Sequence, residues 1–390
     1  MAEELGKHKI ANQLRQYEQI ASTQETFHRC PRCKTKLRPR SKLAFVRDQV
    51  NKGIETNQLV LELFTDHPLA VKRLDDKSLH RVNCCLSFRK ELTESMALVS
   101  ELKRLRQAAA DDNNDEKQQQ SWKDWHIVDL CSGAQCVTAA LCLSILSGVS
   151  VTALDIVSSN ELPHFEDLDW MTISEVKSGE DQDDVGNSAD TTPADDDDML
   201  SSFSYMQRDI HDADLAPQLQ SHISKGNTTS YSGNKVIVLA MHCCGALSQR
   251  ALSLFKELDA AAILVMPCCL PPKNLGYSKK LKTFDPKQAA TSWNPTHIKR
   301  DDEEVKAMEE IFATNDQDEQ YRRWARYLHQ CAISDGNTTV DNTATLYKNI
   351  SSTLKEVDAV LSSRNTLITA IRNGSELANA TNDNVSEKKN

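Results

Sequence analysis

The start of the sequence has no positively charged segment with a following apolar run and cleavage site, so we expect no secretory leader. Residues 1–21, MAEELGKHKIANQLRQYEQIA, instead predict a polar amphipathic helix. Twelve cysteines are present, but several stand in adjacent positions, a spacing that does not suit a disulfide scaffold. We therefore expect a protein of a reducing compartment, cytoplasmic or nuclear, whose thiols are free or bound to metal.

Charged side chains are missing between Asp129 and Asp155, over a stretch long enough to suggest a membrane span. Gly133, Gln135, Gly148 and several Ser and Thr residues interrupt this stretch. A strand, a turn, a buried helix, a second turn and a second strand account better for the pattern. We therefore expect no membrane-spanning segment here.

The charge is distributed unevenly along the chain. Residues 156–203 hold fourteen Asp or Glu and one Lys, a net charge of −13, which leaves the rest at +3 from a total of −10. Residues 29–52 contain nine Lys or Arg and a single acid, Asp48. A basic segment of this kind suits a polyanion as the partner.

Composition divides the chain into four zones. Residues 1–106 predict a basic, mostly helical N-terminal region, and residues 107–121 predict a polar linker. Residues 122–373 follow as the main domain, and residues 374–390 as a disordered tail. Within the main domain, residues 160–202 are rich in charge and poor in aromatics, which predicts a disordered surface insertion with ordered chain resuming near Phe203.

Short apolar strands alternate with helices in the main domain. Strands are predicted at 126–131, 149–155, 235–241 and 261–266, helices at 136–147, 246–258, 301–313 and 317–332, and a closing pair of strands within 357–372. Such alternation indicates an α/β domain with a parallel sheet.

Two of these strands end on an acidic residue. Asp129 is followed by small residues and Gly133, which permit a tight turn into a helix, and Asp155 follows 26 residues later, where a carboxylate can accept both hydroxyls of a ribose. The G-x-G-x-x-G fingerprint is missing, and Cys131 and Cys136 stand where further glycines are expected. S-adenosylmethionine, which has no pyrophosphate, therefore fits better than NAD. The alternative is that both aspartates are merely turn residues at strand ends.

Three motifs together resemble a known family: VDLCSG at 128–133, MHCCGALSQRAL at 241–252 and VMPCC at 265–269. They are similar to the class I S-adenosylmethionine methyltransferase domain of the methyltransferase-like group that includes eukaryotic tRNA ribose 2'-O-methyltransferases and the methyltransferase domain of a glutathione-transferase-like protein. The resemblance covers about residues 122–275. It implies a Rossmann-like sheet whose strand order resembles 3-2-1-4-5 with an antiparallel closing strand.

The resemblance also implies the residues that hold the cofactor. They are Asp129, Leu130, Cys131, Ser132 and Gly133 after the first strand, Asp155 after the second, and Asp209 and Ile210 after a presumed third strand, where the adenine would lie. The sequence departs from the family pattern at 135–137, where relatives often carry another glycine, and in its long acidic insertion.

The implied fold brings six side chains to one sheet edge: Cys131, His242, Cys243, Cys244, Cys268 and Cys269. Three interpretations stay open. The cysteines can line a buried pocket; His242 can orient or deprotonate an acceptor hydroxyl; or a cysteine such as Cys244 can act as a covalent nucleophile, or the group can bind a metal. The candidate catalytic residues are His242 and Cys244.

A second cysteine motif lies in the N-terminal region. Cys30 and Cys33 form a C-x-x-C pair beside His28, which is half of a zinc site, and His80, Cys84 or Cys85 offer the remaining ligands. The alternative is two surface or packing thiols.

The combined expectation is an S-adenosylmethionine-dependent methyltransferase acting on RNA, preferably a tRNA-like substrate, with zinc as a possible second ligand. The alternatives are a non-catalytic RNA-binding or scaffold protein that keeps the fold, and a methyltransferase acting on protein or small molecules.

Overall fold

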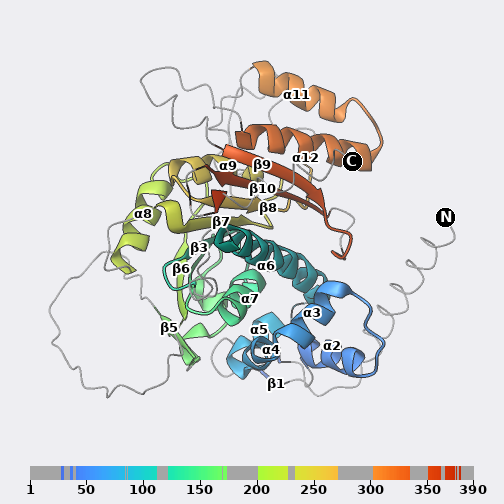
Figure 1. The fold of residues 1–390 in the computed structure, drawn as a ribbon, viewed down its shortest axis with the longest axis vertical. Coiled ribbons are helices and arrows are strands. Elements are labelled where there is room, and N and C mark those ends of the chain that lie inside the picture. The colour runs from blue at the N-terminus through green and yellow to red at the C-terminus, as the bar shows by residue number, and fades with distance from the viewer. Residues whose placement is uncertain are drawn as a thin grey trace.

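An eight-stranded sheet forms the centre of the computed structural model (Figure 1). The structure describes residues 28–29, 36–37, 41–83, 85, 87–111, 122–168, 170–173, 201–226, 233–270, 302–333, 350–361, 365–373, 375 and 377–378. The strands of the sheet are β3 (His126–Leu130), β4 (Ser150–Asp155), β5 (Met171–Ile173), β6 (Ser201–Gln207), β7 (Val236–Ala240), β8 (Ala262–Val265), β9 (Ile350–Glu356) and β10 (Thr366–Arg372).

The strand order is β5-β6-β4-β3-β7-β8-β10-β9. The first six strands in this order, from β5 through β6, β4, β3 and β7 to β8, pair in parallel. β10 pairs antiparallel with both β8 and β9. Without the short edge strand β5, this is the order 3-2-1-4-5-7-6 of a Rossmann-like methyltransferase sheet. The expected fold class, including the antiparallel closing strand, is confirmed.

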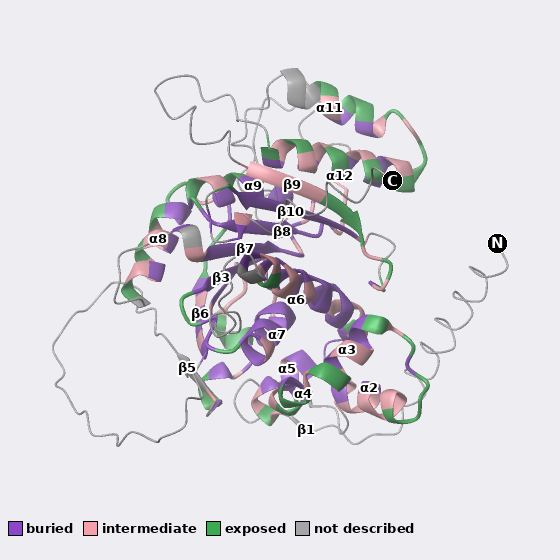
Figure 2. Cartoon of the chain, in the orientation of Figure 1, coloured by how far each residue is buried: buried purple, intermediate pink, exposed green. Residues whose placement is uncertain are grey.

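The central strands are buried on both faces, because side chains alternate in direction along each strand and helices cover both sides of the sheet. Ile127, Ile237 and Leu264 pack with the N-terminal helices and α7 (Val137–Ile145). Val128 and Val238 pack on the other face, where helices α8 (Leu215–Gly226), α9 (Ala246–Glu257) and α12 (Gln317–Ile333) cover the sheet. The central strands are therefore purple, or buried, in Figure 2.

The N-terminal helices are part of the same core as the sheet. They are α2 (Lys42–Asn51), α3 (Gln58–Asp66), α4 (Pro68–Leu74), α5 (His80–Asn83) and α6 (Phe88–Asp111). α4 and α6 both pack against α7, and buried residues such as Leu92 and Leu102 of α6 join one cluster with Ile127 of β3. The helical character expected for this region is therefore found in its described part.

The predicted strands and helices of the main domain are found within a few residues of their expected positions. α11 (Asp302–Phe312) and α12 also match the two helices expected there. Helix α8 and strand β5 were not predicted from the sequence. The uncharged stretch between Asp129 and Asp155 contains the end of β3, α7 and β4. Among the described residues, no helix has the length and hydropathy required to cross a membrane.

Two predicted boundaries at helix and chain ends were wrong. α6 continues to Asp111, into the expected linker 107–121, because alanines favour helix and Ala109 is buried in the core. The expected tail 374–390 begins with packed chain, since Leu377 is fully buried and Ser375 nearly so.

Two further boundaries were wrong within the main domain. The first part of the expected insertion 160–202 contains 3₁₀ turns and β5, because Leu162, Phe165 and Leu168 reach the core, where Phe165 stacks on Phe203 at 4.0 Å. Residues 174–200 of that insertion lie outside the described residues. The closing pair of strands begins at Ile350 rather than 357, since Val357 enters the turn between β9 and β10.

Candidate active site

Asp129 lies at the carboxyl end of β3 and is almost fully buried. Its Oδ2 atom has no hydrogen-bond partner among the described residues. Burial raises the pKa of Asp129 to about 7, although the charge of His242 and the backbone N–H of Ala139 act in the opposite direction. A buried carboxylate with a free oxygen can accept a hydrogen bond from a ligand.

Gly133 and Asp155 meet across the ends of β3 and β4. The backbone N–H of Gly133 donates to Asp155 Oδ2 at 2.8 Å, and the backbone N–H of Val157 donates to Oδ1 at 3.1 Å. Each carboxylate oxygen keeps a second lone pair, so Asp155 retains the capacity to accept two ribose hydroxyls. We call Asp129, Gly133 and Asp155 the donor half of the site, after the methyl donor that the sequence analysis expects at these residues.

The turn between β3 and α7 is left-handed at three positions. Gly133 has a φ of 65°, and Cys131 and Cys136 have φ values of 55° and 48°. These are the two cysteines that stand where glycines were expected from the sequence. A non-glycine residue costs about 1–2 kcal/mol in this conformation, so the backbone demands here are those of a glycine-rich turn.

The remaining predicted cofactor residues have mixed environments. Leu130 packs into the core on the face covered by α8, α9 and α12. Ser132 is buried, and its hydroxyl accepts a 3.6 Å hydrogen bond from the Cys136 thiol. Asp209 is exposed just beyond β6, with its Oδ1 atom accepting from the N–H of His211, while Ile210 is buried. Their roles in cofactor binding stay predictions.

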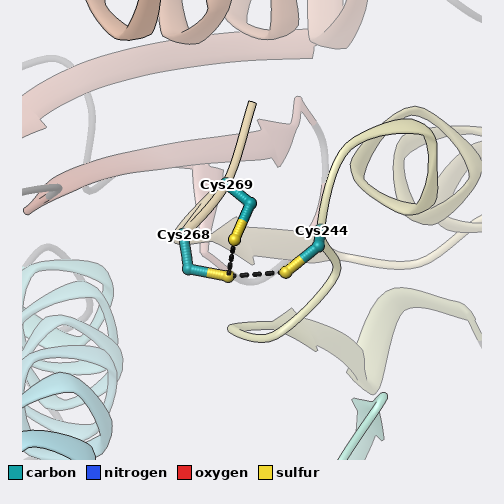
Figure 3. A group of neighbouring side chains, drawn as sticks. All are labelled: Cys244, Cys268 and Cys269. Atoms are coloured by element: carbon teal, nitrogen blue, oxygen red, sulfur yellow. Dashed lines mark hydrogen bonds between the residues drawn. The ribbon is translucent and has the colours of Figure 1, made fainter. Parts of the chain in front are cut away.

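Three cysteines converge at the ends of the next two strands, β7 and β8. The Sγ atoms of Cys244 and Cys268 are 2.8 Å apart, and those of Cys268 and Cys269 are 3.6 Å apart (Figure 3). Cys244 follows β7 directly before Gly245, whose φ of 56° redirects the chain into α9. With His242, these three cysteines form what we call the sulfur half of the site.

His242 is linked to Cys268 by a side-chain hydrogen bond. Burial alone would lower the pKa of His242, but this hydrogen bond and the negative charges of Glu91 and Glu94 raise it above the ordinary value. Hydrogen bonds from Cys244 and His242 hold the pKa of the Cys268 thiol well below its usual range, despite burial. The arrangement therefore favours a thiolate at Cys268 beside a protonated imidazole.

Cys131 and Cys243 form a separate contact instead of joining the sulfur half. Cys243 is fully buried, its thiol donates to the carbonyl of Leu130 at 3.9 Å, and it is hydrogen-bonded to Cys131. The six side chains expected to converge at this edge are thus divided into two groups. The burial of Cys243 agrees with pocket lining, whereas the sulfur half has the contacts of a reactive or ligand-binding group.

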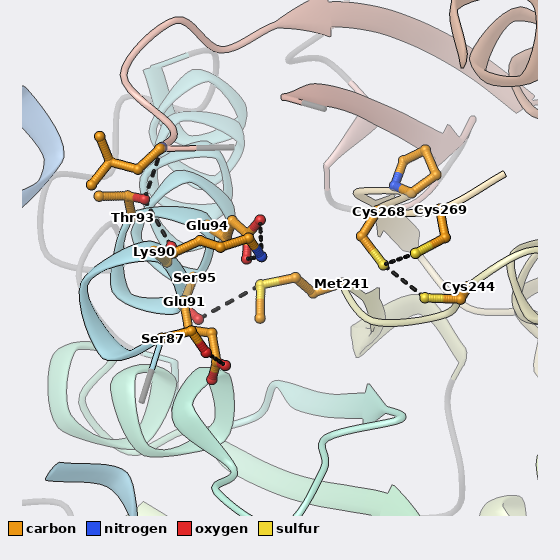
Figure 4. A network of polar contacts seen from close by, with 12 residues as sticks. Ser87, Lys90, Glu91, Thr93, Glu94, Ser95, Met241, Cys244, Cys268 and Cys269 are labelled. Atoms are coloured by element: carbon orange, nitrogen blue, oxygen red, sulfur yellow. Dashed lines mark hydrogen bonds and ion pairs between the residues drawn. The ribbon is translucent and has the colours of Figure 1, made fainter. Parts of the chain in front are cut away.

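Helix α6 contributes residues that the sequence analysis did not assign to the site. Glu91 and Glu94 lie on its first turns, on the side of the helix that faces Met241 (Figure 4), and their charges act on His242. Glu94 is buried and paired with Lys90 at 2.8 Å. The available signal in the sequence was a glutamate on the apolar face of an amphipathic helix. The sequence does not show which strand end the helix meets.

Other missed residues hold the loops of the sulfur half. The hydroxyl of Tyr321 on α12 donates to the carbonyl of Pro267 at 2.7 Å, immediately before the cysteine pair. The hydroxyl of Ser248 donates to the carbonyl of Cys243. These bonds join α12 and α9 to the strand ends, so the cysteines stand on braced backbone.

The N-terminal zinc candidates Cys30 and Cys33 lie outside the described residues, as does Cys84. Strands β1 (His28–Arg29) and β2 (Lys36–Leu37) pair antiparallel on either side of the C-x-x-C segment. Cys85 is hydrogen-bonded to Ser87, and the ring of His80 contacts that of His164 at 5.2 Å. The zinc assignment there stays a prediction.

No family model matches the sequence, and no curated protein is similar to it. Among solved structures, the chain is similar to MycE, a methyltransferase from the mycinamycin biosynthetic pathway in complex with Mg and SAH, with 9% identity and a TM-score of 0.27. The match covers 64% of this chain and 44% of that one, so the chain spans less than half the length of MycE.

Proposed function

We propose that this protein is an S-adenosylmethionine-dependent methyltransferase that acts on RNA. The observation that carries the proposal is the donor half, at the carboxyl ends of the first two strands of a methyltransferase-type sheet. Ligands of such sheets bind at this edge. The free buried oxygen of Asp129 and the remaining lone pairs of Asp155 fit the polar groups of the cofactor.

S-adenosylmethionine supplies an electrophilic methyl group on its sulfonium when bound. In the proposal, Asp155 accepts the ribose hydroxyls, and Gly133 lets the backbone approach the cofactor closely because it carries no side chain. Asp129 holds a polar group of the cofactor from inside the sheet edge. Asp209 and Ile210 are proposed to border the adenine, since they follow β6 at the same edge.

His242 is proposed to act on the acceptor. Its raised pKa shifts the imidazole toward the protonated form, in which it orients an acceptor by donating a hydrogen bond. The neutral form can instead take the acceptor's proton as a general base. Since Cys268 already engages His242, the sulfur half sets which of the two forms prevails. Cys244, the other predicted catalytic residue, acts in this proposal through its hydrogen bond to Cys268.

The RNA substrate rests on the basic segment 29–52. Within its described part, Arg47 is paired with Asp75 at 2.9 Å and Lys52 with Asp48 at 2.8 Å, so these two cations are partly neutralised. The phosphate contacts are therefore assigned to the cations before residue 41.

The first experiment is calorimetric titration with S-adenosylhomocysteine, followed by transfer of a labelled methyl group to fractionated cellular RNA and protein. Binding together with labelled RNA is the expected result. Binding without any labelled product would favour a scaffold that keeps the fold, and labelled protein would replace RNA as the substrate. Absence of binding would contradict the proposal.

The second experiment tests the RNA contacts by changing Arg29, Arg32, Lys34 and Lys36 to Glu. Because each phosphate contact contributes about 0.9 to the slope of log affinity against log salt, RNA binding should weaken and its salt slope should fall by roughly three to four. The control variant Arg47→Gln with Lys52→Gln removes two cations already held in ion pairs and should change the slope less. An unchanged slope in the first variant would assign the segment to another partner.

A further inference from the structure

The sulfur half contains three thiols, all outside disulfides, with the spacing of metal ligands. The Sγ atoms of Cys244, Cys268 and Cys269 all lie within 4.8 Å of one another. In a tetrahedral zinc site with Zn–S bonds of about 2.3 Å, neighbouring sulfurs are about 3.8 Å apart. The 3.6 Å separation of Cys268 and Cys269 is close to that value, and the 2.8 Å separation of Cys244 and Cys268 needs to open by about 1 Å.

The three sulfurs reach one point from two separate loops. Cys244 comes from the loop after β7, and the adjacent pair comes from the loop after β8 (Figure 3). β7 and β8 are hydrogen-bonded neighbours, and Tyr321 holds the carbonyl that precedes Cys268. A site built on braced strand ends is preorganised for a ligand.

The chemistry of the donors selects the class of metal. Thiolates are soft ligands that favour zinc and related transition ions over magnesium or calcium. Three thiols packed this closely are otherwise a costly arrangement, since each ionised sulfur repels the next. A divalent cation binding all three as thiolates releases their protons and leaves a single net negative charge.

We propose that Cys244, Cys268 and Cys269 bind one Zn²⁺ ion at the carboxyl edge of the sheet, with the fourth ligand position open. His242 stands outside the mutual 4.8 Å group but is hydrogen-bonded to Cys268, so it serves as the outer partner that orients this ligand. An open fourth position is the mark of catalytic zinc sites, where it takes a water or a substrate atom. In the metal-bound site both sulfurs are thiolates, so the ion replaces the Cys244–Cys268 hydrogen bond of the proposed function. No residue of the donor half takes part, so loss of the metal and loss of cofactor binding can be measured separately.

The test must separate this site from the candidate pair Cys30 and Cys33. The full-length protein carrying Cys30→Ser and Cys33→Ser is purified under reducing conditions and its zinc is measured by inductively coupled plasma mass spectrometry. About one zinc per chain should remain. Adding Cys268→Ser should remove it, whereas adding Cys331→Ser, a half-buried cysteine on α12, should not. Retention of zinc after Cys268→Ser would overturn the proposal.

Cobalt substitution supplies a second readout, made on protein in which Cys244, Cys268 and Cys269 are intact, so it does not depend on how well the Cys268→Ser variant folds. Co²⁺ added to the metal-free Cys30→Ser, Cys33→Ser protein should give thiolate charge-transfer absorption and the visible bands of a tetrahedral ion. His242→Gln should keep these bands but weaken metal affinity by about 10–100-fold, as expected for an outer partner. Absence of thiolate absorption in the parent protein, with all thiols reduced, would also overturn the proposal.

A disulfide is the competing outcome for Cys244 and Cys268. Intact mass measured without reductant distinguishes the two, because a disulfide removes two hydrogens whereas zinc binding leaves the reduced mass after denaturation in acid. If the protein contains a Cys244–Cys268 disulfide and takes up no metal after this bond is reduced, the zinc proposal is wrong and the two cysteines form a redox pair. Titration with S-adenosylhomocysteine in the same samples shows whether the donor half works with or without the ion.

Discussion

The donor half and the sulfur half lie on neighbouring strand ends but place their polar groups in different ways. In the donor half, backbone N–H groups of nearby residues hold the carboxylates, as Gly133 and Val157 do for Asp155. In the sulfur half, side chains hold one another across β7, β8 and α6. Single substitutions in the donor half should therefore act locally, whereas those in the sulfur half should alter the protonation of several groups.

The largest expected effect is that of His242→Ala on methyl transfer. Loss of a group that orients or deprotonates the acceptor should lower the rate by about 10²–10⁴-fold. Binding of S-adenosylhomocysteine should stay almost unchanged, because His242 belongs to the sulfur half. Single-turnover transfer and calorimetry measure the two quantities separately. Full activity in this variant would remove His242 from the mechanism, and a parallel loss of binding would abolish the distinction between the halves.

The second prediction concerns the pH dependence of stability at Asp129. Its pKa of about 7 in the folded protein exceeds the unfolded value, so between about pH 4 and 7 the folded state keeps a proton that the unfolded state has released. Asp129 should therefore contribute a fall in the free energy of unfolding as pH rises, by up to about 1.4 kcal/mol per pH unit. His126, whose pKa burial lowers to about 3, contributes in the opposite direction below its unfolded value, so the contribution of Asp129 is read as the difference between the variant and wild type.

Asp129→Asn should remove this slope and gain at most about 4 kcal/mol relative to wild type above pH 7. Urea denaturation at pH 5 and pH 8 measures the difference. Asp124→Asn, at an exposed carboxylate paired with Lys235, is the control and should keep the wild-type slope. Equal slopes for Asp129→Asn and wild type would show that this carboxylate ionises freely in the folded protein.

The third prediction concerns the ribose contact. Asp155→Ala should weaken S-adenosylhomocysteine binding by about 1–3 kcal/mol, because two charge-assisted hydrogen bonds are lost. The variant also frees the N–H groups of Gly133 and Val157, so the melting temperature is measured alongside the calorimetric affinity. Unchanged affinity in a folded variant would leave Asp155 with only its role in the turn.

The smallest expected effect is that of Cys131→Gly on stability. Relief of a left-handed φ, about 1–2 kcal/mol, is offset by the larger unfolded-state entropy of glycine, about 0.5–1 kcal/mol. The free energy of unfolding should thus rise by no more than about 1.5 kcal/mol. Cys136→Gly has the same backbone relief but deletes a fully buried side chain, so it should be the less stable of the two. The reverse order in urea denaturation would show that packing of Cys131 against Cys243 matters more than its backbone strain.

The periodicity of the sequence was sufficient to predict the α/β alternation and the ends of β3, β4, β7 and β8. Strands buried on both faces are continuous apolar runs, and their ends are marked by Asp129, Asp155, His242 and Pro267. Parallel strands deliver their carboxyl ends to one edge, so the general location of the candidate site followed from chain order.

Boundaries were less predictable where a few apolar residues decide whether a polar segment packs. Phe165 and Leu377 pull stretches expected to be disordered onto the core. Ala109 extends α6 into the expected linker. Disorder was predicted from the average composition of each segment, in which a single apolar residue has little weight. Packing depends on whether each apolar residue finds apolar neighbours in the fold.

The division of the cysteines into two groups was decided by the tertiary structure alone. Cys243 and Cys244 are adjacent in sequence, yet one turns inward toward Cys131 and the other meets Cys268 from the next strand. The approach of Glu91 and Glu94 likewise depends on how α6 docks on the sheet. The local sequence pattern specifies strands and turns because these form through contacts between near neighbours in the chain. The charges and sulfurs of this site come from segments far apart in the sequence, and only the tertiary structure places them side by side.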